Sequence, residues 1–122
     1  RSTDFLSSYT LLEEVLAQPE GSFQRDDTIL RFEFAYELSW KAIKLWLETR
    51  DITALSPKDG LREAIQLGLL TDGNGWSPLH QMRNLTSQTY DEAQAAKVYN
   101  FMQREGVQLF AELAREAQAW SR

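Results

Sequence analysis

The sequence predicts an all-α protein, an up-and-down bundle of four main helices with a short extra helix. Apolar residues recur at three- and four-residue steps through long stretches of the chain, which is the period of an amphipathic helix. The breaks in this period hold most of the 3 Pro and 6 Gly residues, as expected where helices end. No stretch alternates apolar and polar residues over the length of a strand, and no internal repeat occurs. The 122 residues suit one domain, and we expect residues 1–122 to form it.

Composition and charge restrict the classes of function. Apolar residues make up 43% of the chain, and 6 Phe, 4 Tyr and 4 Trp are enough to fill a packed core. The net charge of −5 disfavours nonspecific nucleic-acid binding, although two or three cations can still form a local anion site. The sequence has no Cys and 1 His, which excludes cysteine nucleophiles, disulfides and metal centres built on several such ligands. We therefore expect neither a metal nor a cofactor.

The apolar stretches are too short for a membrane protein. The longest ones are interrupted by Gln66 or Gly68 and fall far short of the roughly 20 residues that a membrane span needs. The chain opens with Arg1-Ser2-Thr3, without Met and without an apolar signal core, so we interpret this start as trimmed. We expect a soluble, cytoplasmic protein without a membrane partner.

Two long helices are expected in the first half of the chain. The first runs over residues 4–17 and stops before Pro19-Glu20-Gly21. The second runs over residues 27–49, roughly 35 Å at about 1.5 Å per residue, and Asp26-Asp27 lies at its start, where carboxylates favour the helix dipole. Its apolar surface is wider than one stripe, because it also includes Leu30, Phe34, Leu38 and Leu45. We therefore expect two neighbouring elements, or one neighbour and a second subunit, to cover this surface.

The third and fourth helices are expected to be shorter. The third opens at Pro57, because Ser56 can cap it and Pro suits the first helical position, and it ends at or just after Gly68. Asp72-Gly73-Asn74-Gly75 predicts a turn. Ser77-Pro78 then predicts the start of the short fourth helix, by the same pairing of cap and proline.

The last helix is expected after a break in the chain. The polar tract Thr86-Ser87-Gln88-Thr89 has weak helix propensity and predicts an irregular turn. A long amphipathic segment follows Asp91-Glu92, whose carboxylates we expect to cap it, and runs toward Trp120. For both acidic pairs of the chain we favour capping over metal binding.

The polar stretch between the last two helices is the candidate site. It reads Arg83-Asn84-Leu85-Thr86-Ser87-Gln88-Thr89-Tyr90 and is dense in hydrogen-bonding side chains. At about 100° per residue, the side chains of Arg83 and Gln88 diverge by about 140°, so they meet only if the helix breaks or a second subunit contributes. The simpler interpretation is that Arg83 forms a surface ion pair and the Thr/Ser tract caps the last helix.

His80 lies three residues before Arg83, on the same helical turn. Histidine titrates near neutral pH, so His80 could act as a base beside a phosphate held by Arg83. The residues alone favour an exposed His in the first turn of a helix. The aromatic residues of the second helix favour packing over stacking on bases, because they recur at helical spacing: Phe32, Tyr36, Trp40 and Trp46.

Several segments together resemble one family, the nucleotidyltransferase substrate-binding proteins. They are residues 31–41 (RFEFAYELSWK), 56–59 (SPKD), 62–64 (REA), 67–69 (LGL), 83–87 (RNLTS) and 90–92 (YDE). That family belongs to the HEPN superfamily of helical bundles, is usually homodimeric, and is typically encoded beside a minimal nucleotidyltransferase. The resemblance implies a HEPN-like bundle, a homodimer and a nucleotidyltransferase partner encoded nearby.

The resemblance also assigns roles to the candidate site. Many HEPN proteins are metal-independent ribonucleases that carry an Arg, a polar residue after it and a His five residues beyond the Arg, brought together across the dimer. Arg83 and Asn84 match, but Gln88 stands at the His position, and its amide cannot take a proton near neutral pH. The resemblance therefore implies binding by Arg83, Asn84, Thr86 and Ser87 without efficient general-base cleavage.

Tyr90 is a candidate for covalent modification. In toxin–antitoxin members of this group, the partner nucleotidyltransferase transfers AMP to a Tyr two residues after the motif His, and Tyr90 occupies that position. A phenol is a weak nucleophile, so the partner would have to activate it. The alternative is a Tyr that packs at the start of the last helix.

Two functions are therefore expected from the sequence. The first is a non-catalytic helical subunit that binds a minimal nucleotidyltransferase and helps bind its nucleotide or acceptor substrate, with a nucleotide or RNA at Arg83. The alternative is a HEPN-type, metal-independent ribonuclease toxin that a cognate nucleotidyltransferase neutralises by modifying Tyr90.

Overall fold

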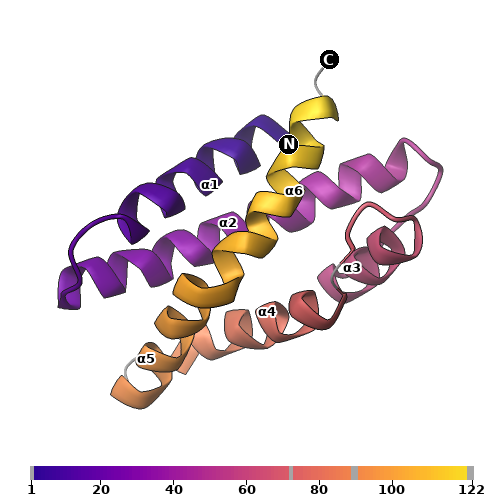
Figure 1. The fold of residues 1–122 in the computed structure, drawn as a ribbon. Coiled ribbons are helices and arrows are strands. Elements are labelled where there is room, and N and C mark those ends of the chain that lie inside the picture. The colour runs from indigo at the N-terminus through magenta and orange to yellow at the C-terminus, as the bar shows by residue number, and fades with distance from the viewer. Residues whose placement is uncertain (1, 72, 89–90, 121–122) are drawn as a thin grey trace.

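The protein is a bundle of helices joined by short turns (Figure 1). The computed structural model describes residues 2–71, 73–88 and 91–120, and no strand occurs among them. The elements are α1 (Ser2–Leu16), α2 (Ser22–Glu48), α3 (Pro57–Gln66), α4 (Gly73–Leu85), the 3₁₀ turn η1 (Thr86–Gln88), α5 (Glu92–Phe101), the π-helical turn η2 (Met102–Gly106) and α6 (Val107–Trp120). Because α5, η2 and α6 follow one another without a break, they form one long helix. All described elements are helical, which confirms the expected all-α bundle.

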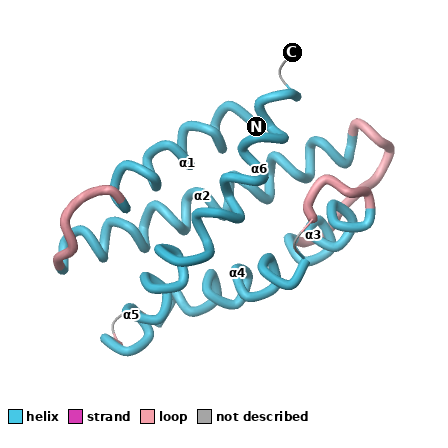
Figure 2. The backbone as a smooth tube through the Cα atoms, in the orientation of Figure 1, coloured by secondary structure: helices cyan, strands magenta, loops and turns pink. Residues whose placement is uncertain are grey.

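The long helix α2 is the centre of the arrangement. It contacts α1, α3, α4, α5 and α6, while α1 packs against α6 on the other side. In Figures 1 and 2, α3 and α4 return along α2, and α5–α6 then runs back across it. The topology is therefore up and down, as the sequence predicts.

The core is centred on the ring of Phe110 in α6. Its centroid lies 6.0 Å from those of Phe5 in α1 and Trp76 in α4, and 6.1 Å from that of Phe32 in α2. All four side chains are buried. The helices α1, α2, α4 and α6 therefore each contribute one large ring to this cluster. The cluster holds α4 against α2, and the candidate site begins at the end of α4. Within residues 2–71, 73–88 and 91–120, no helix combines the length and apolar character that crossing a membrane requires.

Helix α2 begins at Ser22, and the predicted start at Asp27 is wrong. A contact with the end of α1 holds the additional turn in place, because Gln24 is buried and its Nε2 donates to the carbonyl oxygen of Val15 at 2.9 Å. As a result, Asp26-Asp27 lies in the second turn and does not cap the helix. Asp27 instead accepts a hydrogen bond from Nε of Arg31, one turn further on, at 3.1 Å.

Helix α3 begins where the sequence predicts. The Oγ of Ser56 accepts the backbone N–H of Asp59 at 3.2 Å, and Pro57 is the first helical residue. The helix ends at Gln66, slightly before the predicted end at Gly68. Gly68 lies just beyond the helix with φ of 81°, and the N–H groups of Gly68 and Leu69 donate back to carbonyls of the last turn. Glycine adopts this left-handed conformation without steric cost, so Gly68 acts as the C-terminal cap just beyond the last residue of α3.

Helix α4 begins at Gly73, so the predicted start at Ser77-Pro78 is wrong and Pro78 lies inside the helix. Asp72 of the predicted turn lies outside the described residues. Trp76 and Leu79 are each 1% exposed, and their burial in the core requires helical backbone through this region. Packing thus overrides the local signal, although Pro78 lies beyond the first turn, where a proline removes one N–H donor and its ring crowds the carbonyl four residues earlier.

Candidate functional site

Helix α4 ends inside the polar stretch, as predicted. The hydroxyl of Thr86 donates to the carbonyl oxygen of Arg83 at 2.6 Å, and that of Ser87 donates to the carbonyl oxygen of Asn84 at 3.1 Å. These side chains satisfy carbonyls of the last turn of α4, which the 3₁₀ turn η1 leaves without their usual partners. The Thr/Ser tract therefore terminates α4, and the interpretation that it caps the last helix is wrong.

Asp91 caps the last helix, which confirms the expected role of the acidic pair at that position. Its Oδ1 accepts the backbone N–H of Ala93 at 2.8 Å. Glu92 instead reaches a second helix. Its two carboxylate oxygens accept hydrogen bonds from Nη2 of Arg25 in α2, at 3.1 and 3.0 Å. Within the described residues, no three His, Asp or Glu side chains are grouped so that they could hold a metal ion.

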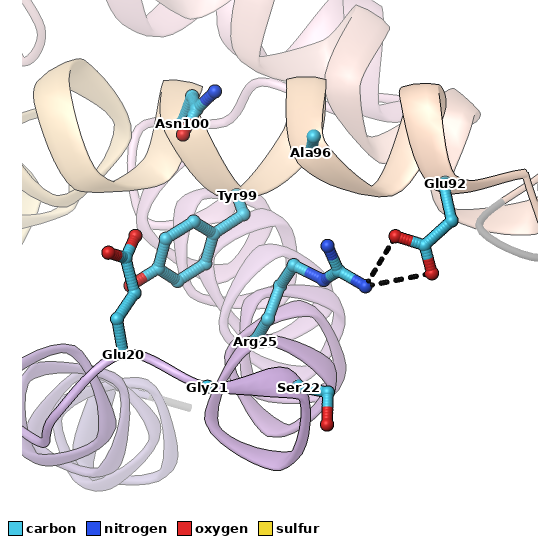
Figure 3. Close-up of a pocket in the computed structure, with 8 residues that line it drawn as sticks. All are labelled: Glu20, Gly21, Ser22, Arg25, Glu92, Ala96, Tyr99 and Asn100. Atoms are coloured by element: carbon cyan, nitrogen blue, oxygen red, sulfur yellow. Dashed lines mark hydrogen bonds and ion pairs between the residues drawn. The ribbon is translucent and has the colours of Figure 1, made fainter.

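The Arg25–Glu92 pair lies in a polar cavity of about 590 Å³ at the start of α2. Figure 3 shows Arg25 reaching from α2 to Glu92 on α5, with the ring of Tyr99 beside Glu20 on the other side of the cavity. Because these residues come from α2, α5 and the turn after α1, the pair fixes the start of α5 against α2. It thereby positions the chain that leaves the candidate site.

Arg83 forms an ion pair with α2, as the simpler interpretation predicts. Its Nη2 donates to Oε1 of Glu37 at 3.4 Å, and its Nη1 donates to Oγ1 of Thr86 at 3.0 Å. The side chains of Arg83 and Glu37 are 30% and 49% exposed, so the pair lies at the surface. The Nε of Arg83 is buried without a hydrogen-bond partner among the described residues. An anion that binds Arg83 here must compete with the carboxylate of Glu37.

Asn84 follows Arg83 in sequence but faces a different helix. It lines a groove of about 630 Å³ between α3 and α4, together with His80 and Gln81. Arg83 is not among the described residues that line this groove. The structure thus separates Arg83 and Asn84, which the sequence analysis placed in one binding site.

His80 is half-buried in the middle of α4, so the expectation of an exposed first-turn His is wrong. Its Nδ1 lies 2.5 Å from the hydroxyl of Tyr36 in α2. Burial and, to a smaller extent, the nearby Glu37 raise the pKa of Tyr36 from 10.0 to about 12, while Arg83 acts in the opposite direction. The hydroxyl therefore stays protonated at neutral pH and can donate to Nδ1 of the His80 tautomer that carries its proton on Nε2.

The contact between Tyr36 and His80 has no signal in the sequence. The two residues are 44 positions apart, and Tyr36 occupies a helical position typical of core packing. That packing prediction is itself confirmed, because Phe32 and Tyr36 are buried and Trp40 and Trp46 pack against the core.

Two residues of the expected motif are not placed. Gln88 belongs to η1, but its side chain lies outside the described residues, and so does the whole of Tyr90. The condition under which Arg83 meets Gln88, and the choice between modification and packing of Tyr90, therefore stay as the sequence analysis left them.

Comparison with known proteins identifies the class to which this bundle belongs. The family described as nucleotidyltransferase substrate binding protein like matches residues 1–119. The chain belongs to this family, which confirms the resemblance seen in the sequence.

Three individual proteins are similar to the chain. A probable ribonuclease HepT from Haemophilus influenzae is 47% identical over 76 residues, which cover 58% of this chain and 52% of that protein. The chain thus spans about half the length of this curated relative. A solved Haemophilus influenzae structure, described as the fold of a substrate binding domain of a nucleotidyltransferase, is 30% identical with a TM-score of 0.84 and covers 97% of this chain and 99% of that one. A solved structure from Thermus thermophilus is 27% identical with a TM-score of 0.84, covering 93% of this chain and 98% of that one.

Proposed function

We propose that this chain is a non-catalytic, cytoplasmic subunit that binds a minimal nucleotidyltransferase and helps bind its nucleotide or acceptor substrate. Residues 1–122 would form a single HEPN-like domain. Family membership supports this proposal, as does the similarity over nearly the whole chain to a protein described as a substrate binding domain of a nucleotidyltransferase. The observation that carries the non-catalytic part is the placement of the chain's single His.

General-base cleavage of RNA requires a group that takes the proton of the 2′-hydroxyl and a cation that binds the phosphate. The imidazole of His80 is held by Tyr36 and lines a groove that Arg83 does not line. Gln88 offers only an amide, and the guanidinium of Arg83 is already paired with Glu37. These observations support a binding role over a hydrolytic one.

We further propose that the subunit is a homodimer formed through α2. Four large apolar side chains lie on one face of this helix and are 45–89% exposed: Phe23, Leu30, Phe34 and Leu45. A row of exposed large apolar side chains on one helix face is typical of an interface. Glu37 lies one turn from Phe34 and pairs with Arg83, so a second copy on this face would approach the candidate site.

Co-purification tests the main proposal. The chain is expressed together with the nucleotidyltransferase encoded beside it, and the two should elute as one complex. The purified chain, incubated with RNA in the absence of metal, should give no cleavage above background. Robust cleavage that Arg83→Ala abolishes, and that the exposed control Arg104→Ala retains, would overturn the non-catalytic assignment.

The second candidate is a ribonuclease toxin neutralised by its partner. Similarity to the probable ribonuclease HepT and the retained Arg83-Asn84 favour it. In that case, incubation with the partner and ATP should attach AMP to Tyr90, with loss of the leaving pyrophosphate. Intact-mass spectrometry would detect the adduct, which Tyr90→Phe should abolish and Tyr99→Phe should retain.

A further inference from the structure

The groove between α3 and α4 has the dimensions and composition of a small-molecule site. Its volume of about 630 Å³ lies within the range of ligand pockets in proteins. Apolar surface comes from Leu61 and Ile65 on α3 and from Trp76 on α4. The side chain of Trp76 is 1% exposed, and its indole N–H has no hydrogen-bond partner among the described residues. A buried donor without a partner is unfavourable, so a ligand acceptor that reaches this N–H would relieve the cost.

The rim of the groove is positively charged although the protein as a whole is negative. Lys58 and Arg62 line it, and none of its described lining residues is a carboxylate. Arg62 is partly neutralised, because its Nη2 contacts Oδ1 of Asp59 at 3.0 Å, but Lys58 has no ion pair among the described residues. In a chain of net charge −5, this concentration of cations at a cavity favours an anionic ligand.

The remaining polar side chains of the groove suit the edge of a heteroaromatic ring. Gln66, Gln81 and Asn84 each offer an amide that both donates and accepts, which is the pairing that nucleobase edges require. His80 also lines the groove, and its contact with Tyr36 fixes the orientation of the ring. The groove thus combines an apolar wall, amide groups and cations.

We propose that this α3–α4 groove binds a nucleoside phosphate, with the base against Leu61, Ile65 and Trp76 and the phosphate at Lys58 and Arg62. The inference rests on the proposed function and deepens it: of the two substrates of a nucleotidyltransferase, this groove holds the nucleotide. It also places the binding site in a groove that Arg83 does not line.

Calorimetric titration of the purified chain tests the assignment with three probes. ATP carries both the base and the phosphates, whereas adenosine and inorganic tripolyphosphate each carry one part. ATP should bind, and each of the other two should bind at least about 10-fold more weakly, because both halves of the groove contribute. If tripolyphosphate binds as tightly as ATP, the groove recognises only the phosphates and not the base, and the proposal is overturned.

Variants locate the binding. Lys58→Gln should weaken ATP binding several-fold and leave adenosine binding unchanged, whereas Lys97→Gln, an exposed lysine on α5, should leave both unchanged. The indole N–H resonance of Trp76 should shift when ATP is added, while that of Trp46, which stacks on Trp120, should not. Equal effects of the two lysine variants would place the nucleotide elsewhere and overturn the proposal.

The same preparation separates this inference from the proposed function. If the chain co-purifies with its nucleotidyltransferase but gives no heat with ATP and no shift of Trp76, the nucleotide assignment of the groove is wrong while the subunit role stands. If ATP binds with the expected variant effects but no nucleotidyltransferase is bound, the groove assignment holds and the subunit role is wrong.

Discussion

A single buried hydroxyl controls the surroundings of the chain's one imidazole. Tyr36 is 4% exposed, and its hydroxyl lies against Nδ1 of His80, so one ring nitrogen is occupied by a neighbour from α2. Removal from water favours the neutral phenol, and Glu37 adds to this effect. His80 therefore serves as part of the packing between α2 and α4 and as a wall of the groove.

Tyr36→Phe should lower the free energy of unfolding at neutral pH by about 0.5–1.5 kcal/mol, because the hydrogen bond to His80 is lost. The variant should also change the alkaline behaviour. The pKa of Tyr36 rises from 10.0 to about 12 in the folded protein, so its contribution to stability is complete below pH 10 and is lost as the pH rises toward 12. Urea unfolding across this range should show a shallower decline in Tyr36→Phe than in the parent.

Tyr99→Phe is the matched control for this measurement. Tyr99 is also buried but makes no hydrogen bond with other described residues through its hydroxyl. It should keep the parent's alkaline decline. Equal declines in the parent and in Tyr36→Phe would contradict the assigned role of the Tyr36 hydroxyl.

Gln88→His tests the chemistry of the motif. If the proton acceptor is the missing part, an imidazole at this position should create or raise metal-independent RNA cleavage by about 10²- to 10⁴-fold. Adding Arg83→Ala should abolish the gain, while Gln88→Asn, which keeps an amide, should show none. If Gln88→His stays inactive, a missing proton acceptor does not explain the lack of cleavage, and the pairing of Arg83 with Glu37 becomes the next explanation to test.

At the scale of elements, α3 is attached to α2 through a glycine. Gly60 lies inside α3, where glycine ordinarily weakens a helix. A Cβ at this position would lie 2.5 Å from Cζ3 of Trp40 in α2, so only glycine allows the two helices to approach so closely. This contact holds α3 in place and thereby forms one wall of the groove.

Gly60→Ala should therefore destabilise the protein by about 1–3 kcal/mol, even though alanine favours a helix by about 1 kcal/mol. The clash with Trp40 outweighs the gain in propensity. Thermal unfolding would measure the effect, with Gly21→Ala as a control, since a Cβ at Gly21 meets nothing within 4 Å. An increase in stability would show that α3 can shift away from α2.

At the scale of the whole molecule, the exposed apolar face of α2 is the main surface that the bundle leaves uncovered. Phe23 and Phe34 are 89% and 58% exposed, although the other large rings of the same helix are buried or pack against the core. The same face carries Glu37, the partner of Arg83. The proposed dimer would therefore couple assembly to the candidate site through α2.

Phe34→Glu should convert the dimer into a monomer, because a charge at the centre of an apolar interface is costly to bury. Light scattering would report a mass near 14.1 kDa instead of twice that value, with unchanged helical content by circular dichroism. Leu67→Glu changes a leucine of 47% exposure outside α2 and should stay dimeric. A parent protein that is already monomeric would remove the dimer proposal.

The candidate site was only partly predictable from the sequence. The break after Leu85 and the cap at Asp91 depend on short-range chemistry, and both predictions are confirmed. The predicted ion pair of Arg83 is also confirmed, but its partner Glu37 lies 46 positions earlier in the chain, and the sequence analysis did not name it. The groove that contains Asn84 and the orientation of His80 were not predicted. They depend on which face of α4 meets α2 and which meets α3, and periodicity within one helix does not specify its neighbours.

The sequence by itself determined the all-α bundle and the start of α3 at Ser56-Pro57, because these follow from the apolar period and from backbone chemistry within a few residues. It also indicated the family, through the resemblance of several short segments to that family. Only the tertiary structure decided that α2 begins at Ser22 and α4 at Gly73, since the burial of Gln24 and Trp76 against distant elements outweighs the local signals. It also decided that Arg83 and Asn84 face different helices. Contacts between residues far apart in the chain settle these points, and such contacts form only when the whole bundle packs.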